Sequence, residues 1–393
     1  MEVFIVAGEP SGDRQGGALA QEIRRLEPRV RIAGVGGRAM AAAGAALVFD
    51  SSGWAAIGVG EALKKIPGLW LKQRAMVRRL RERPPAVLIL IDFGAFNLRL
   101  ATAIQGTGIP ILYYFPPRSW SRDAPTGDLT QLVDAIATPF PWSQRVLSGG
   151  RAQVRWVGHP LVEQVRPALS PAAARERWAI GEDERVVAVA PGSRAQELRY
   201  LLPELLGAAR LLNADVADLR WVASAAPGVR EEQLRQRFAR VGIEPIVVGG
   251  LNPDLLQIAD LALVTSGTAT LELAILEVPM VVVYKVSPTT RLQYEVVRRM
   301  RGPLRYIAMP NVIAQRAVVP ELIQERAGAA SIAAEGRRLL DDRAAAEEIR
   351  RELRAVVAEL GPPGASARTA AMALALARRQ PIEDGCIAFP VPQ

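Results

Sequence analysis

The stretch LILIDFGAFNLRLA, residues 88–101, shows the pattern that decides the fold. An unbroken apolar run ends at Asp92, and the spacing of apolar residues then becomes helical. A short buried strand followed at once by a helix is typical of parallel sheets covered by helices. Because ligands bind beyond the carboxyl ends of such strands, a carboxylate at this exit is also a candidate for chemistry.

The same alternation of strand and helix continues through both halves of the chain. Strand-like runs occur at residues 3–8, 31–36, 86–92, 109–115 and 133–138, and then at 185–190, 219–224, 245–250, 260–266 and 279–285. A chain of 393 residues exceeds one typical core. We therefore predict two Rossmann-like α/β domains, 1–165 and 166–335, whose sheets face each other across a cleft that holds the site.

The last part of the chain has a different pattern. From about residue 320 the sequence is helical in character and rich in Ala, Arg and Glu. We expect residues 336–393 to form helices and a tail that pack back on the first domain or are exchanged in a homodimer.

Composition excludes several classes of protein. Half of the residues are hydrophobic and 23% are charged, as in globular proteins. The apolar runs are too short to span a membrane, and the start MEVFIVAGEPSGD lacks the basic region of a signal peptide. One cysteine and one histidine rule out an internal disulfide and multi-histidine metal sites. We expect a cytoplasmic protein without a bound metal or cofactor.

The net charge of +9 is concentrated in residues 64–83, KKIPGLWLKQRAMVRRLRER, which hold eight Lys or Arg and one Glu. The apolar residues of this segment fall on roughly one helical face: Leu69, Trp70, Met76, Val77 and Leu80. One interpretation is a surface helix packed on its domain with a solvated basic face. The other adds contact with an anionic membrane surface, which we expect as a partner in place of nucleic acid.

The first strand exits into AGEPSGDRQGG, which lacks a dinucleotide-binding fingerprint. Its glycines make the turn permissive, and Ser11 or Asp13 suits the cap of the next helix. The functional alternative makes Asp13 or Glu9 a general base, with Ser11 and Gly12 beside the substrate.

Two turns of the second half suit a diphosphate. One is PGSRAQE, with Gly192, Ser193, Arg194 and Glu197; the other is TSGTATLE, with Ser266, Gly267, Thr268, Ala269, Thr270 and Glu272. Amides at a helix start bind anions, an arginine adds charge, and an acid suits ribose hydroxyls. Ordinary helix capping explains either turn alone, but both together favour a nucleotide diphosphate.

Six motifs resemble, in order, those of the lipid-A-disaccharide synthase family, over residues 1 to about 360. They are GEPSGD (8–13), GVGG (34–37), VGHPL (157–161), PGSRAQE (191–197), TSGTATLE (265–272) and PNVIAQRAVVPELIQ (310–324). The resemblance implies an inverting, membrane-peripheral glycosyltransferase of the GT-B fold, with a UDP-sugar donor, a lipid-linked or acylated sugar acceptor and release of UDP. It also implies a dimer with exchanged C-terminal segments.

The resemblance assigns roles to particular residues. It places UDP on Arg194, Ser193, the turn 266–270, Glu272 and Asn311, and it places Glu9, Ser11 and Asp13 toward the acceptor. His159, in VGHPL, either serves as a structural hinge at the joint between the domains or contacts substrate. Asn97, after the 86–92 strand, is a candidate for substrate binding.

This chain departs from the family at the strand exit. The family pattern D-x-P-D-F-N is DFGAFN here, so Ala95 replaces the second acid, and Ala86 replaces an acid that some members carry at the start of the strand. The candidate bases are then Asp13, Glu9 and Asp92, in that order. For Asp92 itself, we expect a structural role more than a catalytic one: its side chain would hold the turn by accepting backbone amides near Asn97. The alternatives to a transferase are a UDP-sugar 2-epimerase or hydrolase, and a nucleotide-sugar or lipid-binding relative that has lost catalysis.

Overall fold

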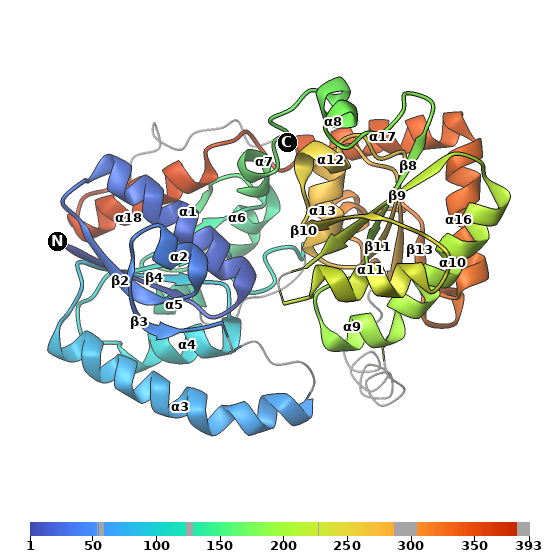
Figure 1. The fold of residues 1–393 in the computed structure, drawn as a ribbon. Coiled ribbons are helices and arrows are strands. Elements are labelled where there is room, and N and C mark those ends of the chain that lie inside the picture. The colour runs from blue at the N-terminus through green and yellow to red at the C-terminus, as the bar shows by residue number, and fades with distance from the viewer. Residues whose placement is uncertain (53, 55–58, 123–128, 227, 287–304, 383–393) are drawn as a thin grey trace. The chain divides into compact units, whose positions relative to one another are not determined.

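The computed structural model describes residues 1–52, 54, 59–122, 129–226, 228–286 and 305–382, with the backbone alone at 59–67 and 195. The chain divides into two compact units (Figure 1). Met1–Glu163 and the chain from Glu359 onward form the first, and Gln164–Ala358 form the second. The crossings at 163/164 and 358/359 therefore give the first unit a contribution from both ends of the chain.

The first unit is built on a seven-stranded sheet in the order β3-β2-β1-β4-β5-β6-β7, with every pair parallel. Its strands are β1 (Glu2–Ala7), β2 (Arg31–Gly36), β3 (Ala46–Asp50), β4 (Val87–Ile91), β5 (Ile111–Tyr114), β6 (Ala135–Thr138) and β7 (Gln153–Trp156). Its helices are α1 (Pro10–Leu26), α2 (Arg38–Ala42), α3 (Val59–Glu82), α4 (Gly94–Ala103), α5 (Leu129–Leu132), α6 (Pro141–Leu147), α7 (Leu161–Gln164) and α18 (Ala365–Ala377).

Helices cover both faces of this sheet, which explains the continuous apolar run of β4. Val87, Ile89 and Ile91 point to the core shared with α1 and α18. Leu88 and Leu90 point to the opposite core, shared with α3 and α4. The strand ends therefore project functional side chains from a framework that is rigid on both sides.

The second unit repeats this architecture with a six-stranded sheet, β10-β9-β8-β11-β12-β13, again parallel throughout. Its strands are β8 (Arg185–Ala190), β9 (Leu219–Ala225), β10 (Ile246–Gly249), β11 (Leu261–Thr265), β12 (Met280–Tyr284) and β13 (Glu321–Ile323). Its helices are α8 (Pro171–Arg177), α9 (Ala195–Tyr200), α10 (Leu202–Asp215), α11 (Glu231–Ala239), α12 (Pro253–Leu256), α13 (Thr268–Ile275), α15 (Met309–Ala314), the short 3-10 helix η1 (Gln324–Arg326), α16 (Ala329–Asp341) and α17 (Arg343–Ala358).

The structure adds three strands to those expected: β3, β7 and β13. All three are edge strands, and only alternate residues of β3 are even half-buried, so they lack the continuous apolar run that marks the central strands. In the described chain beyond about residue 320, β13 is the exception to the expected helical pattern, and it completes the second sheet beside β12.

The segment expected at 336–393 is split between the units. Helix α17 packs on α13, α15 and α16 of the second unit, whereas α18 packs on α1, β4 and β5 of the first. The amphipathic pattern was equally consistent with either surface. The N-terminus of α18 is capped by Glu163, whose carboxylate accepts hydrogen bonds from the amides of Gly364 and Ser366 at 2.5 and 3.1 Å.

Candidate active site

The exits of β1 and β4 lie side by side at the carboxyl edge of the first sheet. Ala7 is paired with Ile91, so the residues that follow each strand are neighbours. Gly8 packs so closely on the ring of Phe93 that a Cβ added there would lie 2.2 Å from its Cδ1 atom. Asp92 and Phe93 both have the left-handed backbone conformation, with φ of 46° and 49°. Strain of this kind is typical of functional turns.

Asp92 presents its carboxyl group at this edge. Burial raises its pKa from 3.8 to about 6, and the nearby charge of Glu9 adds to that rise, against a smaller lowering by the amide of Phe93. A carboxylate of this kind changes protonation near neutral pH, which suits a general base. Glu9 itself is half-buried and precedes α1 without capping it through its side chain.

The turn after Asp92 is held through the main chain of Asp92. Its carbonyl oxygen accepts hydrogen bonds from Asn97 Nδ2 at 2.8 Å and from the Tyr113 hydroxyl at 2.7 Å. Asn97 is fully buried, and its Oδ1 has no hydrogen-bond partner within the described residues. Asn97 therefore shapes the strand exit and leaves the Asp92 carboxylate available for chemistry.

Asp13 has a different task. Its carboxylate accepts three backbone hydrogen bonds, from the amides of Gly37, Ala39 and Met40 at 2.6, 2.9 and 3.1 Å. These are the amides that open α2, so Asp13 caps that helix from a distance and both oxygens are engaged. The motif GVGG contributes the closely packed Gly37, where a Cβ would lie 2.9 Å from Asp13 Oδ2. Of the candidate bases, Asp13 therefore has both carboxylate oxygens engaged by backbone amides.

The other residues expected at this site differ in exposure and in position along the strand. Ser11 is exposed and Gly12 is buried in the first turn of α1. Ala95 is exposed in the first turn of α4, beside the Asp92 turn. Ala86 precedes β4 and so lies at the opposite edge of the sheet, about 17 Å of strand from the exit. Of the two missing acids, Ala95 is the one that bears on this site.

His159 is a buried packing residue of the first unit. Its Nδ1 accepts the amide of Leu161 at 3.2 Å, and its own amide donates to Leu360 at 2.9 Å. Its ring contacts Phe115 and Phe140, each with centroids 5.5 Å away. Burial lowers its pKa to about 3, so the imidazole is neutral at physiological pH. These contacts favour the packing role over contact with substrate.

In the second unit, the exits of β8 and β11 are adjacent because those strands pair. After β8, Gly192 has φ of 94°, and the amides of Ser193 and Arg194 donate to Glu197 Oε2 at 2.9 and 3.0 Å. Those two amides are therefore engaged by a carboxylate. The Arg194 side chain is 62% exposed and 3.6 Å from Glu197, so a charged group remains at this exit.

After β11, the turn opens α13 with exposed small residues. Gly267 and Thr268 are exposed and Ala269 is half-buried, at a helix start of the kind that attracts anions. Ser266 Oγ donates to the carbonyl of Ile307 at 2.7 Å, while Thr270 Oγ1 donates to Gly267 and accepts the amide of Met309. Glu272 is buried one turn into the helix.

Asn311 has a structural role, because both its side-chain oxygen and its side-chain nitrogen are engaged in hydrogen bonds within the protein. Its Oδ1 accepts the amides of Val318 and Val319, and its Nδ2 donates to Val319 and to Glu321 Oε1 at 2.8 Å each. Glu321 also accepts the amides of Ile307 and Ala308. Sequence reasoning missed Glu321, although it stands in the same motif as Asn311. The network fixes the 305–308 loop against the α13 turn.

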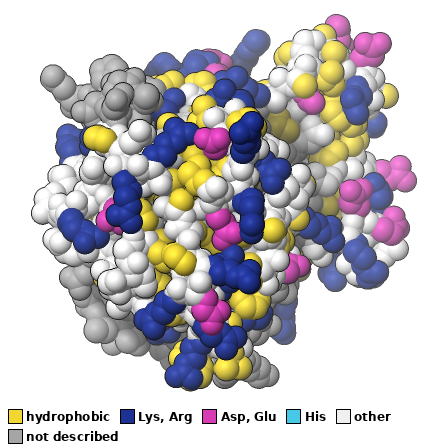
Figure 2. Space-filling view, turned by 90° about the vertical axis from the view of Figure 1, so that its left-hand side faces the viewer, with side chains coloured by type: hydrophobic (Ala, Val, Ile, Leu, Met, Phe, Trp, Pro, Cys, Tyr) yellow, Lys and Arg dark blue, Asp and Glu magenta, His cyan; other side chains and the backbone are white. Residues whose placement is uncertain are grey.

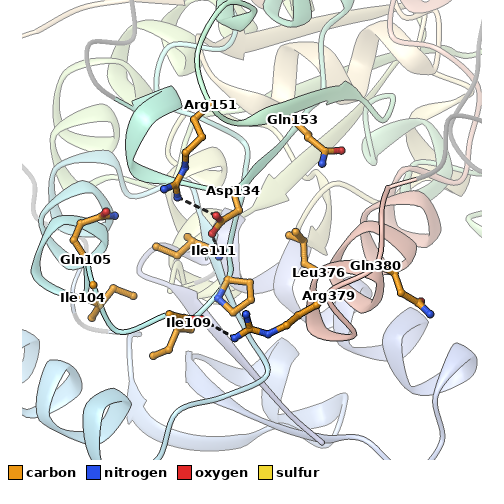
Figure 3. A pocket seen from close by; sticks show the side chains of 13 residues that line it. Ile104, Gln105, Ile109, Ile111, Asp134, Arg151, Gln153, Leu376, Arg379 and Gln380 are labelled. Carbon is orange, nitrogen blue, oxygen red and sulfur yellow. Dashed lines mark hydrogen bonds and ion pairs between the residues drawn. The ribbon is translucent and has the colours of Figure 1, made fainter.

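Some surfaces lie away from these exits. A cavity of about 710 Å³ opens where β5, β6 and β7 begin, at the amino edge of the first sheet, and is lined by Asp134, Arg151 and Arg379 (Figure 3). Ligands of parallel sheets bind at the other edge, so this cavity is no candidate for the chemistry. Within the described chain, no three His, Cys, Asp or Glu side chains gather where they could hold a metal ion.

The basic segment 64–83 lies on α3, and the side chains of Lys64 and Lys65 fall outside the described residues. Met76 and Leu80 are fully buried, and Leu69 and Val77 pack against the same core. Most of the apolar face therefore serves internal packing. Trp70 and the adjacent Leu71 are the exposed large apolar side chains described on this helix, at 49% and 61%. The guanidinium of Arg74 lies 3.7 Å from the Trp70 ring centroid.

Lys and Arg side chains clearly outnumber Asp and Glu on one face of the first unit (Figure 2). Some cations of the first unit have an acidic partner, as Arg31 and Arg79 share Glu2. Among the described helices, none combines the length and apolarity needed to cross a bilayer.

Comparison with known proteins agrees with these features. A family model described as lipid-A-disaccharide synthetase matches residues 3–375. The lipid-A-disaccharide synthase of Geobacter metallireducens is 37% identical over 95% of this chain and 96% of its own, and that of Myxococcus xanthus is 36% identical over 95% and 97%.

Solved structures share the fold at low sequence identity. A Staphylococcus aureus MnaA–UDP structure has a TM-score of 0.66 at 12% identity, covering 97% of this chain and 98% of its own. The calicheamicin glycosyltransferase CalG4 has a TM-score of 0.59 at 18% identity, covering 96% and 98%. These likenesses concern the two-sheet GT-B architecture alone. The family assignment comes from the family model and from the relatives named lipid-A-disaccharide synthase. The chain belongs to the lipid-A-disaccharide synthase family of glycosyltransferases.

Proposed function

We propose that the chain transfers an acylated glucosamine-type sugar from a UDP-sugar to a lipid-linked sugar acceptor, with inversion and release of UDP. The observation that carries the proposal is the paired exit of β1 and β4, where Asp92 has a pKa of about 6 beside Glu9. Family membership over nearly the whole chain gives the reaction class.

In this proposal Asp92 is the general base. It takes the proton of an acceptor hydroxyl while that oxygen attacks the anomeric carbon, and the bond between that carbon and the UDP oxygen breaks. Burial, and then the charge of Glu9, raise the pKa of Asp92 to about 6. Ser11, Gly12 and Asn97 border or shape the same edge, and Asp13 holds α2 in place.

The donor diphosphate is assigned to the second unit. The start of α13 supplies amides and a positive helix end, and Arg194 supplies a charge at the neighbouring exit. The buried Glu272 is the candidate for ribose hydroxyls. Asn311 acts through the loop that it holds beside this turn. The scheme uses no metal, because cations and amides stabilise the departing UDP.

The test measures UDP release from UDP-sugars with a panel of acylated sugar acceptors. Asp92→Asn is expected to lower kcat by about 100-fold or more, within the range for a general base. Asp134→Asn is the matched control, since that acid precedes β6 at the opposite edge of the same sheet. An unchanged rate in Asp92→Asn would remove the assigned base, and full rate in Arg194→Ala would remove the donor site.

The same assay separates the alternative functions. Turnover of UDP-sugar without any acceptor would indicate an epimerase or hydrolase. Tight UDP binding with no turnover across the panel would indicate a binding protein that has lost catalysis, as the alanine at position 95 allows.

We also propose that the protein binds the inner face of an anionic membrane through α3, where its acceptor would reside. The exposed Trp70 and Leu71 would enter the interface while the surrounding Lys and Arg meet lipid headgroups. The test is co-sedimentation with anionic and neutral vesicles. Trp70→Ser combined with Leu71→Ser should reduce binding, and Leu26→Ser on α1, 41% exposed, is the control. Equal binding to both vesicle types would contradict the electrostatic part.

The homodimer remains a prediction. Helix α18 packs on α1 of its own chain, so an exchanged dimer would have to replace this contact with the same contact from a second copy. Sedimentation velocity over a range of concentrations tests it, and a concentration-independent monomer would contradict it.

A further inference from the structure

Lys285 directly follows β12 and is the starting point of this inference, which rests on the proposed UDP-sugar donor. Its Nζ lies 2.7 Å from Glu204 Oε1, and the two side chains are 30% and 28% exposed. A partly exposed lysine at the carboxyl end of a parallel strand occupies the edge where ligands bind.

The strand order places Lys285 opposite Arg194 across the α13 turn. In the sheet β8, β11 and β12 are consecutive, so their exits carry Arg194, Ser266 and Lys285 in that order. Thr265 pairs with Val283, and the amide of Ser266 donates to the carbonyl of Val283 at 3.2 Å. Thr265 and Val283 are the last pair of this register, so Gly267 and Lys285 each lie two residues beyond it on neighbouring strands.

Glu204 is well placed to orient the ammonium group. It lies in the first turn of α10, and its second oxygen accepts the amide of Ala329 at the start of α16 at 3.0 Å. Its carboxylate is thus fixed from two helices. An ammonium group has three N–H donors, and the bond to Glu204 uses one of them.

We propose that Lys285 binds the diphosphate of the UDP-sugar and stabilises the charge on the departing UDP, with Glu204 as the residue that positions its ammonium. The diphosphate then sits at the start of α13 between two cations, Arg194 on the β8 side and Lys285 on the β12 side. As the bond to the anomeric carbon breaks, the electron pair stays on the UDP oxygen, and a fixed cation there lowers the barrier.

The experiment compares UDP, UMP and uridine binding to the full chain by calorimetry. Lys285→Met keeps the length of the stem and removes the charge, and it is expected to weaken UDP binding by about 10- to 100-fold while uridine binding changes little. The matched control is Arg337→Met. Arg337 lies on α16 of the same unit and pairs with Asp341 of that helix and with Asp215 of α10. That variant should bind UDP as the parent does.

Two further variants separate charge from structure. Lys285→Arg should restore most of the UDP affinity, and Glu204→Gln should weaken it by only a few-fold, since the cation remains. Equal UDP affinity in Lys285→Met and parent would overturn the inference, and so would an equal loss of uridine and UDP affinity, which would indicate a purely structural ion pair. A parent chain that binds no UDP would instead refute the proposed function.

Discussion

Replacing Asp92 by Asn should stabilise the first unit at neutral pH while it removes activity. The pKa of Asp92 rises from 3.8 to about 6, chiefly because the side chain is buried and then because of Glu9. At about 1.4 kcal/mol per pKa unit, this rise corresponds to an upper limit of about 3 kcal/mol for keeping the charge in the fold. Asn is also the side chain best suited to the left-handed backbone at this position, where φ is 46°.

The sign of the effect depends on pH. A carboxyl group whose pKa is raised by folding binds its proton more tightly in the folded state, so the parent loses stability as pH rises from 3.8 to about 6. The neutral Asn has no such loss. The variant should therefore match the parent near pH 4 and exceed its free energy of unfolding by about 2–3 kcal/mol above about pH 7.

Urea titration is the assay, with unfolding of the first unit followed by pulsed hydrogen exchange in peptides from β1 and β4. This readout keeps the two units apart, since a chain of this size need not unfold in one step. Asp50→Asn is the control of opposite sign, because hydrogen bonds from Ser52 lower the pKa of Asp50. A difference between Asp92→Asn and parent that stays constant from about pH 4 to pH 8 would refute the reasoning.

Three other predictions concern the strand exits and the loop beside α13. Asn311→Ala removes four internal hydrogen bonds and should lower the free energy of unfolding of the second unit by about 3 kcal/mol. A loss under about 1 kcal/mol in urea titration would contradict the structural role of these bonds. Gly8→Ala forces a Cβ into the Phe93 ring and should cost about 1–3 kcal/mol of stability and lower kcat. Gly12→Ala, whose nearest contact would be 3.5 Å, should leave the free energy of unfolding unchanged in urea titration. Ala95→Asp adds an acid to the first turn of α4, so thermal unfolding should show about 0.3–1 kcal/mol of added stability and the rate of sugar transfer should rise; an unchanged rate would show that the missing acid does not limit this chain.

The central strands were predictable because they are buried on both faces. A strand such as β4, with helices on either side, must be apolar at every position, and this leaves a continuous run in the sequence. Three of the four edge strands, β3, β7 and β13, were not predicted, because pairing on one side places a weaker demand on their side chains; the fourth, β10, still has the apolar run at 245–250. These strands form by pairing with the neighbouring strand of a sheet that is already in place.

The site was predictable at the level of motifs and less so at the level of roles. Glycine and small polar residues are typical of strand exits and helix starts. This pattern made it possible to predict four turns, at Glu9, Asp92, Arg194 and Ser266. The sequence could not show whether the side chain or the main chain of a residue makes the decisive contacts. The turn after β4 is held by the main-chain carbonyl of Asp92, whereas sequence reasoning considered only its side chain.

The sequence by itself determined the two parallel α/β sheets, the family and the positions of the turns, because each depends on local periodicity or on short motifs. The tertiary structure decided what the polar side chains do. Asp13 meets the amides of α2 more than 20 residues away, Asp92 is influenced by Glu9 across two paired strands, and Lys285 meets Glu204 from another helix. Whether a carboxylate caps, titrates or orients depends on neighbours that are distant in the chain, and only folding brings them together.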